Sequence, residues 1–242
     1  MGTTPPGAVN ERQAAEWVRG MFGGIAGKYD FLNHLLSFNM DRRWRRRTVE
    51  RLSQLVPARD ARILDLCCGT GDVAIALEKR RGAPVLAADF CHPMLTEAAG
   101  KLRRENLVSA LFEADGLTLP LKDESLDAIT IAFGFRNFTN YKKALEELKR
   151  VLKPCGIAAV LEFSQPKNAL FGRVYDLFST VLLPKVGGLV SGSPQAYSYL
   201  PESIRKFPNA DELAKRMKES GFLKVEYELM TFGTVALHIG WK

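Results

Sequence analysis

Apolar and polar residues follow two different rhythms along the chain, and the change between them falls near residue 60. From Glu11 to Val56 apolar residues recur at helical spacing, interrupted by several glycines, which predicts a helical preface. From Arg62 onward, short apolar runs of strand length alternate with longer helical patterns. This alternation predicts an α/β domain built on a mostly parallel sheet with helices on both faces.

The second part of the chain can be divided into predicted elements. Strands are expected near 62–67, 84–89, 109–114, 126–133 and 156–163, and helices near 72–81, 93–104 and 141–152. A helix at 211–220 is followed by apolar runs at 222–230 and 233–241, which we expect to pair as an antiparallel hairpin. The predicted sheet therefore begins with parallel strands and ends with an antiparallel hairpin.

Two segments interrupt this regular pattern. Residues 1–10, with Pro5, Pro6 and Gly7, are typical of a disordered tail. The stretch 164–208 holds one apolar helix and much turn-prone sequence, and a long interruption inside a compact domain favours a substrate-covering insertion. We therefore expect one domain over 11–242, with a helical preface at 11–56 and an insertion at 164–208.

The sequence ILDLCCGTGD, at 63–72, is the strongest local signal in the chain. A short apolar strand enters a loop that contains Gly69 and Gly71, and a helical pattern begins at Val73. Glycine suits this loop because a Cβ resists the backbone angles of the turn and because a ligand must approach the main chain closely. Many α/β proteins carry such a loop only to turn the corner, so the loop alone leaves a nucleotide site and a structural turn open.

Polar residues also end the next two predicted strands. Asp89 follows an apolar run, where its carboxylate could accept hydrogen bonds from both hydroxyls of a ribose or simply cap the next helix. Asp115 and the backbone of Gly116 follow the third strand and could bind the edge of an adenine. Open α/β sheets bind ligands at the carboxyl ends of their strands, so these residues are candidates for one nucleoside site.

The loop chemistry favours a cationic ligand over a dinucleotide. In the GxGxxG pattern that seats a pyrophosphate, Cys67 stands at the first glycine, and Asp72 would place a negative charge beside the phosphates. A positively charged cofactor such as S-adenosylmethionine suits an acidic helix start. Asp65 and Asp72 could help to hold the amino acid part of that cofactor.

The motifs together resemble the menaquinone and ubiquinone biosynthesis C-methyltransferases, the UbiE/MenG family. The resemblance runs from about Met21 to the end of the chain and is carried by DLCCGTGD, AADFCHPML, EADGLTLPL, LDAITIAFGFRNFTN, ALEELKRVLKPCG, LEFSQP, YSYLPESIRKFP and GTVALHIGWK. It implies a class I methyltransferase fold with a seven-stranded sheet, S-adenosylmethionine as cofactor with S-adenosylhomocysteine as product, and methylation of a ring carbon of a polyprenylated quinol. It also implies that Thr70, Asp89, Asp115 and Gly116 contact the cofactor.

The sequence departs from the family pattern at two positions. Cys155 stands where the family usually has a second turn glycine, and Ala132 stands where some members place a serine near the cofactor. The first change affects a turn, and the second removes one hydrogen bond, so the resemblance stands. The CCGTGD loop and the short N-terminus favour demethylmenaquinol as the substrate; methylation of the ubiquinone-pathway quinol, 2-methoxy-6-polyprenyl-1,4-benzoquinol, is the alternative, and one enzyme can do both.

The implied chemistry requires a deprotonated hydroxyl on the acceptor ring. Free phenols titrate near pH ~10, so a nearby cation or base is needed at neutral pH. Arg136 and Asn137 follow the fourth predicted strand, and we expect Arg136 to favour the phenolate, directly or through a water, and Asn137 to orient the acceptor. An arginine tied to Asp or Glu in a loop is an equal alternative. Glu162 and Tyr199 are further candidates for proton handling, whereas His238 is more typical of a core histidine.

Composition narrows the class of protein further. The 242 residues are 46% hydrophobic and 25% charged, which is typical of a globular domain. No apolar run is long enough to cross a bilayer and no signal peptide is evident, so we expect a cytoplasmic protein. The four cysteines form no CxxC pair, and neither a disulfide framework nor a metal site is indicated.

The net charge of +7 is concentrated in the segment 41–51, which contains six arginines. Such a run is commonly a solvated helix face, but a polyprenylated substrate makes peripheral contact with a membrane surface an equal expectation. The apolar segment 170–190 could then line a route for the prenyl tail, or it could be a core helix. An RNA methyltransferase and a non-catalytic lipid-binding protein are rival hypotheses; no RNA-binding motif accompanies the arginines, so nucleic acid is not expected. The sequence leaves the oligomeric state open.

Overall fold

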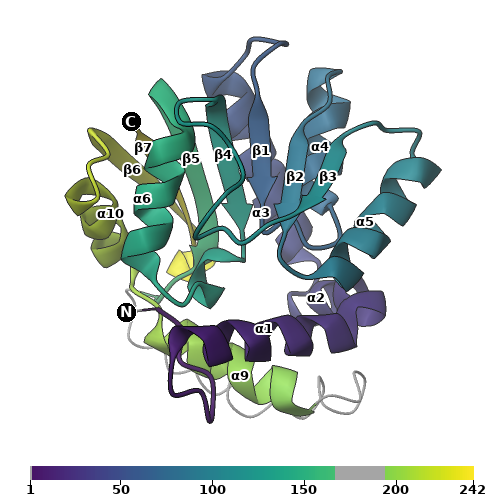
Figure 1. Ribbon diagram of the computed structural model, residues 1–242, viewed down its shortest axis with the longest axis vertical. Helices are drawn as coiled ribbons and strands as arrows, with labels where there is room; N and C mark the ends of the chain where they lie inside the picture. The colour runs from purple at the N-terminus through teal and green to yellow at the C-terminus, as the bar shows by residue number, and fades with distance from the viewer. Residues whose placement is uncertain (1, 167–193) are drawn as a thin grey trace.

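The computed structural model describes residues 2–166 and 194–242, and a seven-stranded sheet forms its centre (Figure 1). The strand order is β3-β2-β1-β4-β5-β7-β6. The strands are β1 (Ile63–Leu66), β2 (Leu86–Asp89), β3 (Ala110–Glu113), β4 (Leu126–Ala132), β5 (Leu152–Phe163), β6 (Lys224–Met230) and β7 (Val235–Trp241). The first five strands pair in parallel, and β7 lies antiparallel to both β5 and β6. The predicted closing hairpin is thus confirmed.

Helices precede, separate and follow these strands. They are α1 (Glu11–Ile25), α2 (Tyr29–Leu36), α3 (Met40–Leu55), α4 (Asp72–Arg81), α5 (His92–Arg104), α6 (Tyr141–Val151), α9 (Pro194–Lys206) and α10 (Ala210–Glu219), with short turns η1 (Ala26–Lys28), η2 (Phe135–Asn137) and η4 (Thr231–Gly233). The predicted ranges agree within a few residues except at β5. That strand begins early because Leu152 pairs with Leu126 before a bulge shifts the register.

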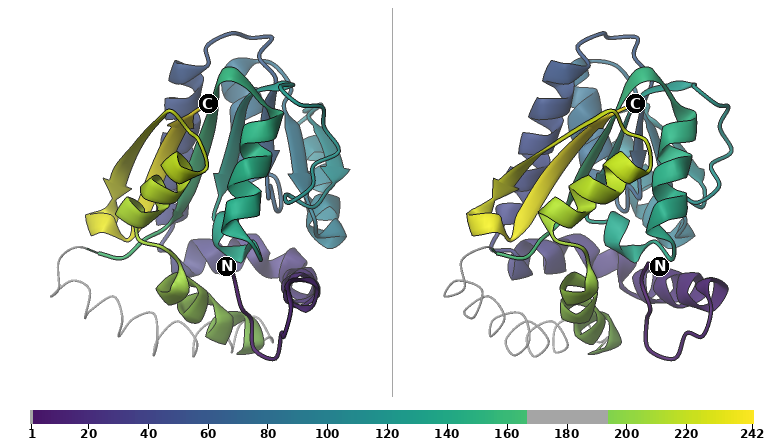
Figure 2. Two further views of the ribbon diagram at one scale, coloured as in Figure 1. Left: turned by 60° about the vertical axis from the view of Figure 1, so that its left-hand side comes forward. Right: turned by 90° about the vertical axis from the view of Figure 1, so that its left-hand side faces the viewer.

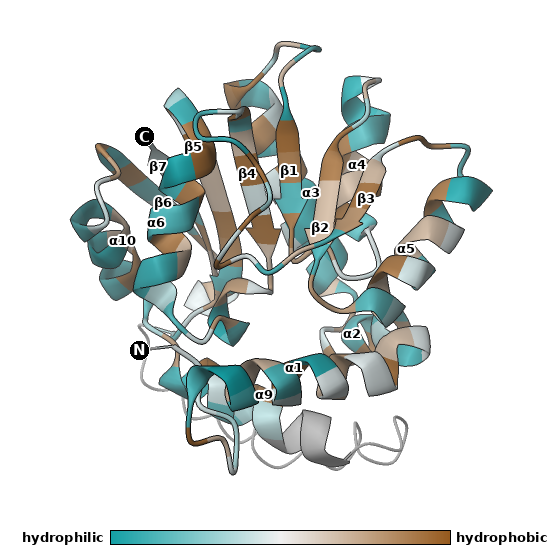
Figure 3. Ribbon diagram, viewed as in Figure 1, coloured by the Kyte–Doolittle hydropathy of each residue, from teal (hydrophilic) through white to brown (hydrophobic). Residues whose placement is uncertain are grey.

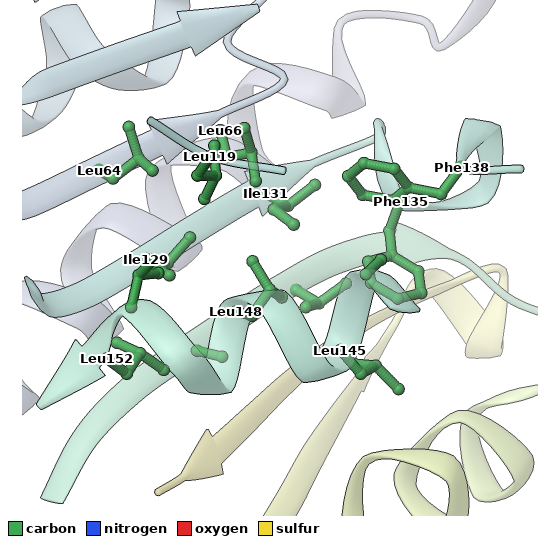
Figure 4. Packing of buried hydrophobic residues seen from close by; sticks show 14 of the residues in the cluster. Leu64, Leu66, Leu119, Ile129, Ile131, Phe135, Phe138, Leu145, Leu148 and Leu152 are labelled. Carbon is green, nitrogen blue, oxygen red and sulfur yellow. The ribbon is translucent and has the colours of Figure 1, made fainter. Parts of the chain in front are cut away.

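Strict alternation along the strands builds a separate core on each face of the sheet. In β4, Ile129 and Ile131 face α6 and α10, whereas Ala128 faces α3 and α4. Figure 4 shows Leu145 and Leu148 of α6 lying over the strand residues. The inner strands β1, β4 and β5 are covered on both faces and are mostly apolar, and Figure 3 shows brown inner strands beside helices that are largely hydrophilic.

The helical preface covers the edge of the sheet at which the parallel strands end. Figures 1 and 2 show α1, α2 and α9 lying across the carboxyl ends of β1, β4 and β5. The rings of Trp17 on α1 and Tyr199 on α9 pack together with centroids 5.0 Å apart. The preface therefore roofs the edge at which α/β sheets bind ligands.

The first residues differ from the disordered tail that the sequence predicts. The side chain of Thr3 is buried, and its backbone N–H donates to the carbonyl of Phe138 at 2.8 Å. The contact is made largely by backbone groups, which leave no mark in the sequence pattern. Of the predicted insertion at 164–208, residues 164–166 and 194–208 belong to the described residues, and the proposed tail route at 170–190 lies outside them.

Candidate active site

A cavity, called here the main cavity, lies between the carboxyl edge of the sheet and α1. About 860 Å³ of space, open solvent included, lies between its lining residues. The residues predicted to form a site that line it are Gly69, Asp89, Asp115, Gly116 and Asn137. The cavity thus brings together residues that follow β1, β2, β3 and β4.

The glycine loop needs its glycines for the reason that the sequence suggests. Gly69 and Gly71 have φ angles of +54° and +86°, in the left-handed region that side chains resist. Cys67 also has a positive φ of 56°, although it carries a Cβ. A Cβ on Gly134 would lie 2.3 Å from the Cβ of Cys67, so Gly134 makes the room that Cys67 occupies. The loop and the segment after β4 are therefore fitted to each other.

Asp89 holds the glycine loop and also faces the main cavity. Its carboxylate accepts hydrogen bonds from the backbone N–H of Gly69 at 2.8 Å and of Cys91 at 2.9 Å. Burial raises the pKa of Asp89, while these amides act in the opposite direction. A carboxylate has about four lone-pair positions, so it retains acceptor capacity for ribose hydroxyls.

The loop after β3 is shaped by a close approach rather than by a turn requirement. Asp115 accepts a hydrogen bond from the N–H of Leu117 at 2.9 Å. A Cβ on Gly116 would lie 2.6 Å from the ring of Phe138, so only glycine fits without displacing that ring. The ring of Phe138 therefore packs directly against the backbone of Gly116, and both residues line the main cavity.

A smaller side pocket adjoins the main cavity behind the glycine loop. The two spaces share Tyr29, Cys67, Gly69 and Ala132 as lining residues. The polar side chains that line the side pocket are Arg45, Asp65, Thr70 and Asp72. Ala132, where a serine stands in some relatives, thus lies at the junction of the two spaces.

Asp65 is the least satisfied charged group of the side pocket. It is 1% exposed, and its Oδ2 has no hydrogen-bond partner among the described residues. Burial raises the pKa of Asp65 to about 8, opposed by the N–H of Ala74 and the charge of Arg45. A buried acceptor without a donor is costly, so a ligand with a cationic donor would satisfy it.

A network of charges closes the other side of the side pocket. The ammonium of Lys101 lies 2.5 Å from Asp30 and 2.6 Å from Asp72, and it donates to Thr70 at 2.9 Å. Thr70 in turn donates to Asp30 at 2.6 Å. Although burial acts against it, the pKa of Asp72 is lowered by Arg45 and Lys101. The network joins α2, the glycine loop and α5.

Arg136 and Glu162 form a buried ion pair beneath the main cavity. The guanidinium donates to Glu162 at 2.9 Å and to the carbonyl of Phe133 at 2.5 Å, and it lies over the ring of Phe163. Burial lowers the pKa of Arg136, but Glu162 outweighs this effect and raises it. Neither Arg136 nor Glu162 lines the main cavity. The structure therefore matches the alternative of an arginine tied to a carboxylate rather than direct contact with an acceptor.

Asn137, which lines the main cavity, is hydrogen-bonded to Tyr199. The Tyr199 hydroxyl donates to Oδ1 of Asn137 at 3.0 Å and lies 2.7 Å from the hydroxyl of Thr3. Burial raises the pKa of Tyr199, so its hydroxyl keeps its proton at neutral pH. Tyr199 therefore acts here as a hydrogen-bond donor rather than a base.

His238 lies in the core of the sheet, as the sequence favours. Its Nε2 lies 2.8 Å from the carbonyl of Ala210, and burial lowers its pKa to about 4. It lines neither the main cavity nor the side pocket. His238 is thus neutral at physiological pH and lies outside both spaces.

The preface contributes to the site, which the sequence left open between a lid over a pocket and a core helix. Tyr29 lines both spaces, and Arg19 and Phe22 of α1 line the main cavity. The polar residues in KYDFLNHLLSFNMD were a signal for such a lid, but their spacing equally suits a core helix. Arg45 was hidden within the arginine run.

The arginines of α3 serve different roles on different faces of the helix. Arg45 binds Asp41 and Asp72, whereas Arg47 and Arg51 approach Glu228 and Glu226 of β6. Arg42, Arg43 and Arg46 are exposed. Half of the run therefore braces the fold, which weakens the hypothesis of an RNA-binding helix.

The chain can be compared with known proteins. Residues 8–242 match the model of the ubiE/COQ5 methyltransferase family. A demethylmenaquinone methyltransferase from Thermus thermophilus is 51% identical over 221 residues, which cover 91% of this chain and 99% of the relative. The ubiquinone/menaquinone biosynthesis C-methyltransferase UbiE from Hydrogenovibrio crunogenus is 43% identical over 93% of this chain and 89% of its own length.

Solved structures support the fold class. A SAM-dependent methyltransferase from Aquifex aeolicus superposes with a TM-score of 0.59 at 21% identity, covering 80% of this chain and 88% of that one. A second SAM-dependent methyltransferase, from Thermotoga maritima, gives a TM-score of 0.62 at 18% identity, covering 92% of this chain and 98% of that one. At these identities the likeness concerns the fold alone, and it confirms the predicted class I methyltransferase architecture.

Proposed function

The chain belongs to the ubiE/COQ5 methyltransferase family, and from this premise we propose that it transfers a methyl group from S-adenosylmethionine to a ring carbon of demethylmenaquinol. The observation that supports the proposal is that one cavity is lined both by Asp89, Asp115 and Gly116 and by Asn137. One space can therefore hold a nucleoside and an aromatic acceptor together. The relative that is 51% identical is named for the menaquinone pathway, which supports demethylmenaquinol over the ubiquinone-pathway quinol.

The residues present fit S-adenosylmethionine. Asp89 would accept from the ribose hydroxyls, and Asp115 with the backbone of Gly116 would meet the adenine. The orphan oxygen of Asp65 suits the α-ammonium, and Thr70 and the main chain of Gly69 and Gly71 border the same space. A purely structural role for these residues would leave the unpartnered oxygen of Asp65 unexplained.

The cofactor supplies the methyl group and a positive sulfonium that favours an electron-rich acceptor. We assign Asn137 to orient the acceptor hydroxyl, because it is the polar side chain of η2 that lines the main cavity. Arg136 and Glu162 act on the acceptor indirectly, by fixing the η2 turn through the N–H of Arg136, which donates to Glu162 at 3.1 Å. Tyr199 holds the Asn137 amide. Positioning of donor and acceptor can supply a large share of the acceleration.

Methyl transfer to chosen acceptors tests the proposal. Purified protein would be incubated with labelled S-adenosylmethionine and either reduced demethylmenaquinone or 2-methoxy-6-polyprenyl-1,4-benzoquinol. We expect label in the demethylmenaquinone product and less or none in the second. Asp89→Asn should weaken cofactor binding, whereas Asp127→Asn, a partly buried carboxylate bound to Lys153 far from the cavity, should not. Absence of label in both quinones would refute the proposal.

We further propose that the protein meets its prenylated substrate at a membrane surface. No helix among the described residues combines the length and hydropathy needed to cross a bilayer. Phe31, Leu35 and Phe38, on α2 and the turn after it, are 60%, 41% and 72% exposed. Exposed Arg42 and Arg46 follow on α3. Apolar side chains beside cations suit an anionic interface.

Vesicle binding separates this surface from a merely solvated one. We expect cosedimentation with vesicles that contain phosphatidylglycerol and weaker binding to phosphatidylcholine alone. Phe31→Ser combined with Phe38→Ser should reduce binding, whereas Leu223→Ser, which changes an 84% exposed leucine beside β6, should not. Equal binding by both variants would show that α2 is not the contact.

A further inference from the structure

The N-terminal residues reach the wall of the main cavity. The backbone N–H of Thr3 donates to the carbonyl of Phe138, directly after η2, at 2.8 Å. The approach is close, since a Cβ on Gly2 would lie 2.1 Å from the same oxygen. Phe138 lines the main cavity, so this tail segment packs on the outer side of a site wall.

The hydroxyl of Thr3 begins a directed chain of hydrogen bonds. Tyr199 donates its only hydroxyl proton to Oδ1 of Asn137 at 3.0 Å. The Thr3 hydroxyl lies 2.7 Å from the Tyr199 oxygen, a contact in which either hydroxyl can donate, and with the Tyr199 proton on Asn137 the donor is Thr3. The order of donation is therefore Thr3 to Tyr199 to Asn137.

The chain determines which way the Asn137 amide points. An asparagine amide can turn over, exchanging its carbonyl oxygen and its NH₂ group. A donated proton from Tyr199 is satisfied only by the oxygen, because the NH₂ group has no acceptor capacity. With Oδ1 turned to Tyr199, the two N–H donors of Asn137 are available to the main cavity. Without Thr3, Tyr199 loses the donor that completes its own hydrogen bonding.

We propose that Thr3 is a positioning residue of the methyl transfer, which acts through Tyr199 to present the Asn137 NH₂ group to the hydroxyl of the acceptor ring. This inference rests on the proposed function. It lies outside the family resemblance, since the family match begins at residue 8. The tail is thus part of the acceptor site of this chain, although its sequence has the composition of a loose end.

Three variants test this role. Thr3→Val keeps the shape of the side chain and removes the donor, and Thr3→Ser restores a hydroxyl. Thr4→Val is the matched control, because Thr4 is exposed and its hydroxyl only approaches Lys206 at 3.4 Å. kcat and KM would be measured with reduced demethylmenaquinone, together with the S-adenosylmethionine Kd by calorimetry and the melting temperature.

We expect Thr3→Val to lower kcat about tenfold, since loss of orientation at one polar contact acts on the reacting geometry. The cofactor Kd should stay within about twofold, Thr3→Ser should recover most of the kcat, and Thr4→Val should match the parent. Tyr199→Phe should lower kcat similarly, and the double variant should be no slower, because both changes break one chain. If Thr3→Val does not fold, Tyr199→Phe alone reports on the chain.

The outcomes distinguish this inference from the proposed function. A parent enzyme that methylates no quinol refutes the proposed function, and the role of Thr3 falls with it. An active parent with undiminished kcat in Thr3→Val overturns the inference and leaves the function standing. A Thr3→Val variant with lower melting temperature and weaker cofactor binding, not recovered by serine, shows a structural role only and also overturns it.

Discussion

Asp65 and Glu162 are both 1% exposed, and they lie on strands β1 and β5, with β4 between them. Glu162 accepts from the guanidinium of Arg136 and from the backbone N–H groups of Arg136 and Phe163. Asp65 keeps one oxygen without a partner among the described residues. The carboxylate of β5 is thus balanced within the protein, and the carboxylate of β1 is not.

The difference shows that burial alone does not identify a functional carboxylate. A buried charge with a complete set of partners contributes to one fixed geometry, whereas a buried charge without them favours its neutral form. Glu162 therefore serves the fold around the site, and Asp65 is suited to a ligand that brings its own positive charge.

The largest expected effect is a loss in the free energy of unfolding when Glu162 is replaced. Glu162→Ala leaves the Arg136 charge buried without a partner and should lower the free energy of unfolding by about 3–5 kcal/mol. Urea unfolding at neutral pH measures this loss. Glu162→Gln, which keeps acceptor oxygen for the backbone N–H groups, should lose less. A loss under about 1 kcal/mol in the alanine variant would contradict the balanced-pair interpretation.

Replacing Asp65 should raise the free energy of unfolding, whereas replacing Glu162 lowers it. The size of the Asp65 effect should depend on pH. The folded-state pKa of about 8 lies above the ordinary aspartate pKa of 3.8, so between these pH values the folded protein binds more protons than the unfolded chain. Stability supplied by protonated Asp65 is present below pH 4 and is lost as pH rises toward 8, by up to about 1.4 kcal/mol per pH unit.

Asp65→Asn removes this proton binding. We expect the variant to gain stability relative to the parent by roughly 3 kcal/mol between pH 5 and pH 7, in protein without cofactor. Chemical unfolding across this pH range provides the measurement. Parallel pH curves for parent and variant would show that Asp65 is already ionised in the free protein and would erase the contrast with Glu162.

Cofactor binding should reveal the same proton. If the α-ammonium of S-adenosylmethionine pairs with Asp65, binding at pH 7 should release close to one proton. The affinity should therefore increase as the pH is raised toward 8, by up to about tenfold per pH unit. Calorimetry in two buffers with different ionisation enthalpies counts the protons. Asp65→Asn should release none, and Glu162→Gln should release as many as the parent.

The smallest expected effect is at an exposed arginine–glutamate pair, Arg47 and Glu228, which serves as the counterpart of the buried pair of Arg136 and Glu162. Arg47 binds Glu228 with both nitrogens of its fork, but the two side chains are 43% and 42% exposed. Arg47→Ala should therefore cost at most about 1 kcal/mol and less at high salt. A double-mutant cycle with Glu228→Gln isolates the pair energy. A cost comparable to that of Glu162→Ala would show that burial does not explain the difference in stability expected between the two ion pairs.

The order of elements was predictable from the sequence because each layer leaves its own period. Strands with two covered faces read as continuous apolar runs, and α6 and α10 show apolar positions at helical spacing. The contact of Thr3 with Phe138 could not be predicted in this way. It depends on a backbone hydrogen bond between segments 135 positions apart, and no apolar side chain announces it.

The residues of the candidate site likewise separate into those that the sequence could predict and those that it could not. Asp89, Asp115 and Gly116 could be placed at one edge because strand ends meet there regardless of side-chain detail. The partner of Arg136 could not, because Glu162 becomes its neighbour only once β5 has paired with β4. Tyr29 and Arg45 were hidden for another reason: a helix that roofs a site has the same spacing as a helix that covers a core.

The position of β7 constrains the order in which the chain can assemble. β6 touches the sheet only through β7, although β7 follows it in the sequence. During synthesis on the ribosome, β5 must therefore remain an open edge until the hairpin of β6 and β7 emerges and docks as one unit. Glu162 lies opposite Ala236 of β7, so its ion pair with Arg136 reaches its final burial among the last steps of folding.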